Sequence, residues 1–213
     1  QSAFALPRPQ AKIAVLRSNP AAIHLGFSDT PAKRDFYNQR LTGAYDLLRN
    51  QHYAVDFISD RQLAKKLDDY ELMMIPSHSI LTEKDLEIVS KYHREGGKIM
   101  AFANCFAKNE LFKDLDKLPG FLGLDKRQVA PWNRGQMRLV EVDPRLNAYF
   151  RTELIVQAPE RVNPGPMGKL IPGYIPKTDM KNTWLVGNQD AYPSMVLSTD
   201  GQVVYCAFDS LYD

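Results

Sequence analysis

Cys105 is the residue of this sequence whose type and position could support the most demanding chemistry. It follows Lys98–Ala103, an apolar run that predicts a buried strand. A cysteine at such a strand end can act as a nucleophile on a strand-to-helix turn, because a helix N-terminus favours the thiolate. The alternative is a small, buried apolar residue. Ala103 and Ala107 favour this alternative, since they stand where the nucleophile turn requires glycine.

His78 is the second reactive residue at a predicted strand end. It comes shortly after the apolar run Leu72–Ile75, where a histidine can act as a base or bind a ligand. A histidine in this position more often caps a loop or faces solvent. One hypothesis is therefore a small cysteine-dependent hydrolase or amidase that uses Cys105 and His78. Its support is the strand-end position of both residues.

Further polar residues mark the carboxyl ends of predicted strands, where open α/β sheets bind their ligands. Besides His78, the candidate ligand-binding residues at these ends are Ser18, Asn19, Asp60 and Asn104. Asp60 could instead cap a turn or a helix. Trp132 is a candidate for stacking on a sugar or for an interface, with packing in the core as the alternative.

Composition and charge argue against several classes of function. The net charge is +2 and the basic residues are scattered among acidic ones, so no basic stripe predicts nucleic-acid binding. No run approaches 18 apolar residues, so the sequence predicts no membrane span. The two cysteines have neither zinc spacing nor a disulfide framework, and no pair of carboxylates stands out for glycoside hydrolysis. We therefore expect no metal and no cofactor.

The elements that position these residues are organised around Tyr70–Asn104. Leu72–Ile75 predicts a buried strand, and Thr82 begins a helix that ends at Gly96–Gly97. Lys98–Ala103 predicts the next strand. Strand, helix and strand in this order form a βαβ unit, and such units build parallel sheets.

The residues before this unit continue the same alternation. The pattern predicts strands over Lys12–Leu16 and Tyr53–Ile58, an irregular loop over Ala21–Pro31, a helix over Ala32–Asn50 and a short helix or turn over Arg61–Asp69. We therefore expect an α/β fold, a doubly wound, mostly parallel, flavodoxin-like sheet with helices on both faces. Residues 1–11 are expected to form a tail or linker, and residues 12–213 a single domain.

The second half of the chain has less regular patterns. They predict a helix over Glu110–Leu118, turns at Pro119–Gly120 and Gly123, and strands over Gln136–Val142, Thr183–Val186, Ser194–Ser198 and Gln202–Phe208, the last two joined by a hairpin turn at Asp200–Gly201. Asn163–Pro176 contains four prolines and three glycines, which predicts a long loop. We expect its Leu170, Ile171 and Tyr174 to contact another subunit or a catalytic domain, the alternative being a loop folded over its own sheet.

These stretches resemble the class I glutamine amidotransferase-like fold and, within it, the middle, trimerisation domain of family 42 β-galactosidases. The resemblance covers nearly the whole chain. The matching stretches are Leu47–Arg49, Tyr53–Ser59, Leu63–Pro76, Glu95–Met100, Leu118–Gly123, Pro193–Val196 and Gly201–Tyr205.

The resemblance implies an accessory role in a glycoside hydrolase. Glutamine amidotransferases use a cysteine and a later histidine, but no histidine follows His93 in this sequence. Relatives that place a histidine directly after the cysteine do not match either, because residue 106 is Phe106. The catalytic glutamates of the β-galactosidases sit on a separate barrel, which needs about 250 residues. The implied function is a non-catalytic oligomerisation or sugar-cleft domain. Its implied partners are further copies of itself or a catalytic glycosidase domain, and a carbohydrate is a possible ligand.

The sequence leaves the cellular compartment open. The chain starts at Gln1 without a methionine, which is compatible with a mature secreted or periplasmic start. Neither the compartment, nor the sugar, nor the number of subunits follows from the residues.

Overall fold

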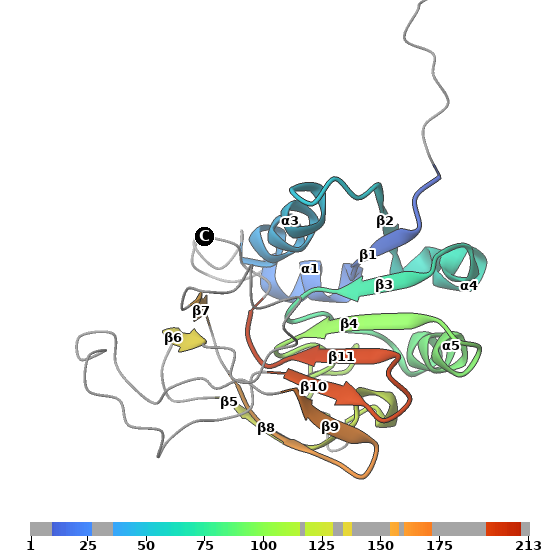
Figure 1. Ribbon diagram of the computed structural model, residues 1–213. Coiled ribbons are helices and arrows are strands. Elements are labelled where there is room, and N and C mark those ends of the chain that lie inside the picture. Colours follow the sequence, from blue (N-terminus) through green and yellow to red (C-terminus); the bar gives the residue numbers. More distant parts are fainter. Residues whose placement is uncertain are drawn as a thin grey trace, which may run out of the picture.

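A seven-stranded sheet, in which five neighbouring strands are parallel, forms the middle layer of the computed structural model (Figure 1). The structure describes residues 10–26, 36–115, 118–129, 134–137, 154–157, 160–171 and 195–209. The sheet order is β2 (Val55–Ser59), β1 (Ile13–Arg17), β3 (Leu72–Ile75), β4 (Lys98–Phe102), β11 (Val203–Cys206), β10 (Met195–Ser198) and β9 (Gly168–Ile171). The last two strands pair antiparallel. The predicted doubly wound, mostly parallel α/β fold is therefore confirmed.

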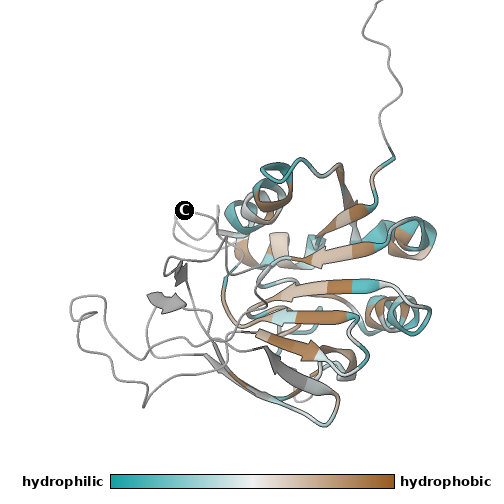
Figure 2. Ribbon diagram, viewed as in Figure 1, coloured by the Kyte–Doolittle hydropathy of each residue, from teal (hydrophilic) through white to brown (hydrophobic). Residues whose placement is uncertain are grey.

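Helices cover both faces of this sheet because its strands alternate their apolar side chains. On one face, Val15 and Met74 belong to the cluster packed under α3 (Phe36–Arg49). On the other, Leu16 and Ile75 belong to the cluster packed under α4 (Leu63–Lys66) and α5 (Glu83–Arg94). Figure 2 shows the apolar strands enclosed by helices whose outer faces are hydrophilic. None of the described helices is long and apolar enough to cross a membrane.

Helix α5 begins and ends where its sequence signals predict. The Thr82 hydroxyl accepts a hydrogen bond from the Asp85 amide at 3.1 Å, which satisfies a free donor of the first turn. After the helix, Gly96 has a φ of 99°, in the left-handed region that favours glycine. A Cβ atom on Gly97 would lie 2.3 Å from the ring of Tyr92, so a side chain there would displace that ring.

The loop predicted over Ala21–Pro31 is wrong in its described part. Residues Asn19–Gly26 form helix α1, and Ser18 caps it by accepting a hydrogen bond from the Ala21 amide at 3.1 Å. Pro20 lies in the first turn, where its missing N–H is not needed. Between β2 and β3, the segment predicted as a short helix or turn is α4 flanked by η1 (Asp60–Gln62) and η2 (Leu67–Asp69).

The helix predicted over Glu110–Leu118 is also wrong in its described part. The Asn109 side chain accepts hydrogen bonds from the Leu111 and Lys113 amides, each at 3.0 Å, so the backbone turns back on itself. A bridge between Lys108 and Asp114 closes this turn. The following turn is confirmed as η3 (Gly120–Leu122), with Gly123 left-handed at a φ of 69°.

The loop predicted over Asn163–Pro176 contains two strands in its described part. These are the end of β8 (Glu160–Pro164), which pairs with β5 (Leu124–Val129), and β9, which extends the main sheet. A further pair joins β6 (Arg134–Met137) and β7 (Leu154–Gln157). The strand predicted over Gln136–Val142 overlaps β6, and its remainder, like Thr183–Val186, lies outside the described residues. The closing hairpin is confirmed, with Gly201 left-handed at a φ of 75°.

Candidate functional site

The carboxyl ends of the parallel strands bring most of the predicted site residues to one edge of the sheet. Ser18 and Asn19 follow β1, Asp60 follows β2, His78 follows β3 and Asn104 follows β4. Whether these side chains can bind a ligand depends on what already contacts them.

Ser18 is completely buried and joins three elements. Its hydroxyl donates a 2.5 Å hydrogen bond to the Ile80 carbonyl and accepts from the Ala21 and Ile80 amides. Its amide donates to the Tyr37 hydroxyl at 2.6 Å, and burial raises the pKa of that hydroxyl. Ser18 therefore caps α1 and fastens the loop after β3, and its hydrogen-bonding capacity is used inside the protein.

Asn19 and Asp60 contact each other. The side-chain amide and the backbone amide of Asn19 both donate to Asp60 Oδ1, at 2.7 and 3.0 Å. This pair ties the end of β2 to the first turn of α1, where the helix dipole also favours a carboxylate. Both residues are half-buried, so they keep some access to solvent.

The loops that carry His78 and Cys105 lie side by side. The His78 amide donates to the Ala103 carbonyl at 3.3 Å, and the Phe106 amide donates to the Ser79 carbonyl at 2.7 Å. His78 has a φ of 62°, and Cys105 stands between two further left-handed residues, Asn104 and Phe106. His78 and Asn104 are half-buried.

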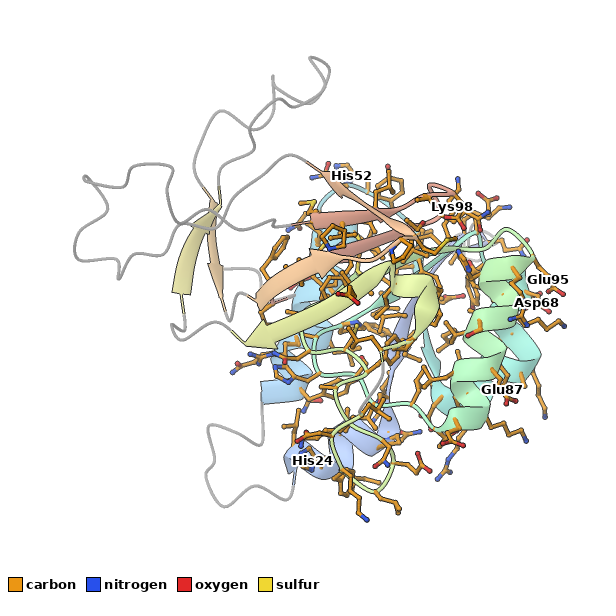
Figure 3. The ribbon with its side chains drawn as sticks, turned by 90° about the horizontal axis from the view of Figure 1, so that it is seen from below. His24, His52, Asp68, Glu87, Glu95 and Lys98 are labelled. Atoms are coloured by element: carbon orange, nitrogen blue, oxygen red, sulfur yellow. The ribbon has the colours of Figure 1, made fainter. Side chains whose placement is uncertain are left out.

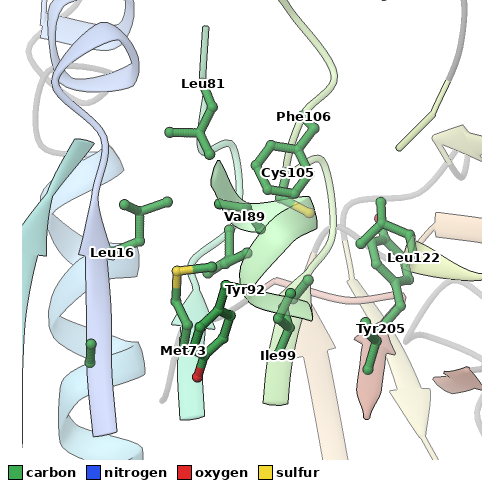
Figure 4. Close-up of a cluster of buried hydrophobic side chains, with 14 of the residues drawn as sticks. Leu16, Met73, Leu81, Val89, Tyr92, Ile99, Cys105, Phe106, Leu122 and Tyr205 are labelled. Atoms are coloured by element: carbon green, nitrogen blue, oxygen red, sulfur yellow. The ribbon is translucent and has the colours of Figure 1, made fainter. Parts of the chain in front are cut away.

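Cys105 itself is 0% exposed and belongs to the core under α5. Figure 4 shows it among apolar side chains, next to Phe106. A nucleophile turn holds its reactive atom out of the sheet toward substrate, whereas this thiol faces the interior. The second cysteine, Cys206, is equally buried, and burial followed by the nearby Cys105 raises its pKa to about 12. Neither cysteine is in a disulfide.

A buried ion pair that sequence reasoning missed completes this edge. Arg40 on α3 pairs with Asp209 beyond β11, and neither residue is more than 3% exposed. Burial lowers the pKa of Arg40 to about 10, while Asp209 opposes this shift. A signal was present: Arg40 lies three residues after Tyr37 and four before Ala44, on the apolar stripe of its helix.

A cavity of about 440 Å³ opens at the opposite edge, near the amino ends of β3 and β4. Its lining includes Asp68, Glu71, Glu95 and Lys98, three of which are labelled in Figure 3. The hydroxyl of Tyr70, which also lines it, donates to Asp56 Oδ2 at 3.0 Å. None of the predicted site residues that the structure describes lines this cavity. Among the described residues, no group of three His, Cys, Asp or Glu is arranged to hold a metal ion.

Of the four remaining predicted residues, the structure describes two. Trp132 and Tyr174 lie outside the described residues. Leu170 and Ile171 belong to β9, the outermost strand of the sheet on its antiparallel side.

Comparison with known proteins relates the chain to much longer enzymes. No family model matches it, and no curated protein is similar to it in sequence. A β-galactosidase from Bacillus circulans sp. alkalophilus superposes with a TM-score of 0.70 and 17% identity, over 94% of this chain and 29% of that enzyme. A family 42 β-galactosidase from G. stearothermophilus gives 0.69 and 15%, over 94% and 28%.

A putative ThuA-like protein from Bacteroides uniformis shares the fold over most of its own length. Its TM-score is 0.59 at 14% identity, covering 97% of this chain and 87% of that protein. The chain thus has the fold of a segment that makes up less than a third of the β-galactosidases, as the resemblance to that family predicted. The wider resemblance to glutamine amidotransferases stays a prediction.

Proposed function

We propose that this chain is a non-catalytic accessory domain that works beside a separate catalytic domain of a glycoside hydrolase. The observation that carries the proposal is the coverage: 94% of this chain superposes on 28–29% of two β-galactosidases. A domain of this size leaves most of such an enzyme, including room for a barrel of about 250 residues, to other segments.

The burial of Cys105 at the carboxyl edge supports a role without chemistry of its own. A thiol reacts as its thiolate and needs access to substrate, and apolar burial opposes both for Cys105. This argues against the alternative hydrolase or amidase built on Cys105 and His78. The ThuA-like protein, which has this fold over 87% of its length, favours a second candidate: a stand-alone protein of the same fold.

Activity measurements test the absence of catalysis. We expect the purified protein to hydrolyse neither glutamine nor an aryl β-galactoside, and native Cys105 to resist a thiol reagent until the core opens. Cys206→Ser is the matched control for Cys105→Ser, because both thiols are fully buried. Glutamine hydrolysis that survives Cys206→Ser but disappears in Cys105→Ser would contradict the proposal.

Association is the second part of the proposal. Among the described strands β9 is an outermost one, so one row of its N–H and C=O groups pairs with none of them. An assembly through Leu170, Ile171 and Tyr174 would cover this edge. A carbohydrate, with Trp132 as a stacking residue, is the further proposed ligand.

The mass of the particle in solution tests this assembly. Replacing Leu170, Ile171 and Tyr174 by serine is expected to lower the mass measured by light scattering, at low and high protein concentration. Met167→Ser is the control, because Met167 is exposed but precedes β9. An unchanged mass with an intact circular dichroism spectrum would mean that these residues only cover their own sheet.

A further inference from the structure

Three aromatic residues gather at the outer edge of β2, at the opposite end of the sheet from β9. Among the described strands β2 is an outermost one and pairs with β1, and Figure 1 shows it beside α3. Phe57, in the middle of β2, is 45% exposed, and Tyr53, two residues before the strand, is 58% exposed. The third residue, Tyr45 on α3, is half-buried. Water therefore reaches two large aromatic side chains at one edge of the sheet.

The fold holds these rings on the face of the sheet that α3 covers. Phe57 is the register partner of Val15, which belongs to the cluster packed under α3. The Phe57 ring lies against the Tyr45 ring, with centroids 5.2 Å apart and planes at 32°. The Tyr53 amide donates to the Leu48 carbonyl, in the last turn of α3, at 3.2 Å. Sheet and helix thus fix the backbone at both exposed rings in advance, which lowers the entropy lost when a ligand binds.

Polar groups surround the two exposed rings. Arg49 is exposed one turn after Tyr45 on α3, and Asp56 is exposed next to Phe57 on β2. Their charges are opposite, so the edge favours neither a cation nor an anion. One row of the N–H and C=O groups of β2 pairs with none of the other described strands. Aromatic faces together with a few hydrogen-bonding groups are typical of a site for a small ligand.

The exposed area favours such a ligand over a protein partner. At their exposed fractions, Tyr53 and Phe57 offer about 200 Å² of surface. A stable protein interface needs about 800 Å² from each partner. A sugar needs far less, because one face of its ring carries C–H bonds that are attracted to the negative face of an aromatic ring. The hydroxyl groups around the sugar ring can then bond to the polar groups beside it.

We propose that Tyr53 and Phe57 form a binding site for a neutral oligosaccharide. Its sugar rings stack on the two aromatic side chains, and its hydroxyl groups bond to Arg49 and to the outer edge of β2. The inference rests on the proposed function, which names a carbohydrate as a ligand, but it uses residues other than Trp132. A site of this kind would hold the chain on a carbohydrate polymer that a neighbouring catalytic domain cleaves.

Titration with β-1,4-linked galactotetraose and with cellotetraose tests the site, by calorimetry and by the proton NMR spectrum of the sugar. We expect at least one probe to bind the unmodified protein, with its ring C–H signals shifted upfield by the aromatic rings. Tyr53→Ala and Phe57→Ala should each weaken binding about tenfold, because each removes one stacked ring. Tyr53→Phe keeps the ring and should keep the affinity. Phe112→Ala is the matched control, because Phe112 is also an exposed aromatic residue but stacks on His24 of α1.

Two results would overturn the proposal. One is that neither probe binds the unmodified protein, a measurement that decides even if Phe57→Ala does not fold. A particle mass that falls in Phe57→Ala while neither probe binds would assign this edge to a second copy of the chain. The other is an unchanged affinity in Tyr53→Ala or in Phe57→Ala, which would place the carbohydrate elsewhere.

Weaker binding in both alanine variants, with the affinity kept in Tyr53→Phe and Phe112→Ala, would support the site. Failure of this site is distinguishable from failure of the proposed accessory role. The accessory role is contradicted by glutamine or galactoside hydrolysis, and neither reaction depends on whether Tyr53 and Phe57 bind a sugar.

Discussion

The two edges of the parallel strands differ in how deeply their polar residues are buried. The carboxyl edge has five buried polar residues, Ser18, Arg40, Ser77, Ser79 and Asp209. The charged residues at the amino edge are exposed around an open cavity. Open α/β sheets bind their ligands at the carboxyl edge. In this protein, internal hydrogen bonds and an ion pair occupy much of that edge. Much of the position that such folds normally use for chemistry therefore holds loops and helices together here.

The two edges also differ in how they use charge. The carboxyl edge encloses the Arg40–Asp209 pair, but the amino edge has Lys12 and Glu71 in contact at 2.7 Å with both side chains exposed. A buried pair that loses one member leaves an uncompensated charge, whereas water replaces the partner of an exposed one. Mutations at the two edges should therefore have unequal effects on the free energy of unfolding.

The largest effect is expected from breaking the buried pair. Arg40→Met should cost about 3–5 kcal/mol of unfolding free energy, because Asp209 then stays buried without its cation. The double variant Arg40→Met with Asp209→Leu should regain part of this loss. The free energies follow from urea unfolding of each variant.

The exposed pair at the other edge is the control for this experiment. Glu71→Gln should leave the urea midpoint unchanged within error. Equal shifts for Arg40→Met and Glu71→Gln would contradict the proposed difference between the edges, and so would an Arg40→Met variant as stable as the unmodified protein.

Ser18→Ala is expected to have the second largest effect. It removes a helix cap and leaves the Ile80 backbone without its side-chain partner, which together should cost about 1–3 kcal/mol. Ser90→Ala is the matched control, because the Ser90 hydroxyl donates only to the Leu86 carbonyl within α5 in the described contacts. The control should stay within about 0.5 kcal/mol, since alanine favours helix. If both variants unfold at the same urea concentration, Ser18 does not fasten this edge.

The same contrast explains how much of the molecule could be predicted. The βαβ unit was predictable because its signals are local: the cap at Thr82, the stop at Gly96–Gly97 and two apolar runs. The β5–β8 pair was not, since it joins residues as far apart in the sequence as Leu124 and Pro164. Pairing between distant strands leaves little trace in a local pattern.

The candidate site was predictable to a similar extent. The strand-end rule placed Asn19 and Asp60 at one edge, but it could not show that they contact each other. Arg40 was missed because its partner Asp209 lies 169 positions later, although a charge within an apolar stripe was visible. The burial of Cys105 was predictable, because Ala103 and Ala107 argued against a nucleophile turn, and the structure confirms it.

The smallest effect is expected at the amino edge, where Tyr70 lines the cavity. Burial, followed by the hydrogen bond to Asp56, raises the pKa of Tyr70 to about 12. A raised pKa means that the folded state favours the neutral phenol, so this contribution is present below the unfolded value of about 10 and is lost as the pH rises through 12. Tyr70→Phe should therefore make stability fall less steeply between about pH 9 and 11. Tyr53→Phe is the control, because Tyr53 is 58% exposed and should leave that slope unchanged. Urea midpoints measured across this pH range show how steeply stability falls in each variant. If it falls as steeply in Tyr70→Phe as in Tyr53→Phe, the folded protein does not favour the neutral phenol of Tyr70.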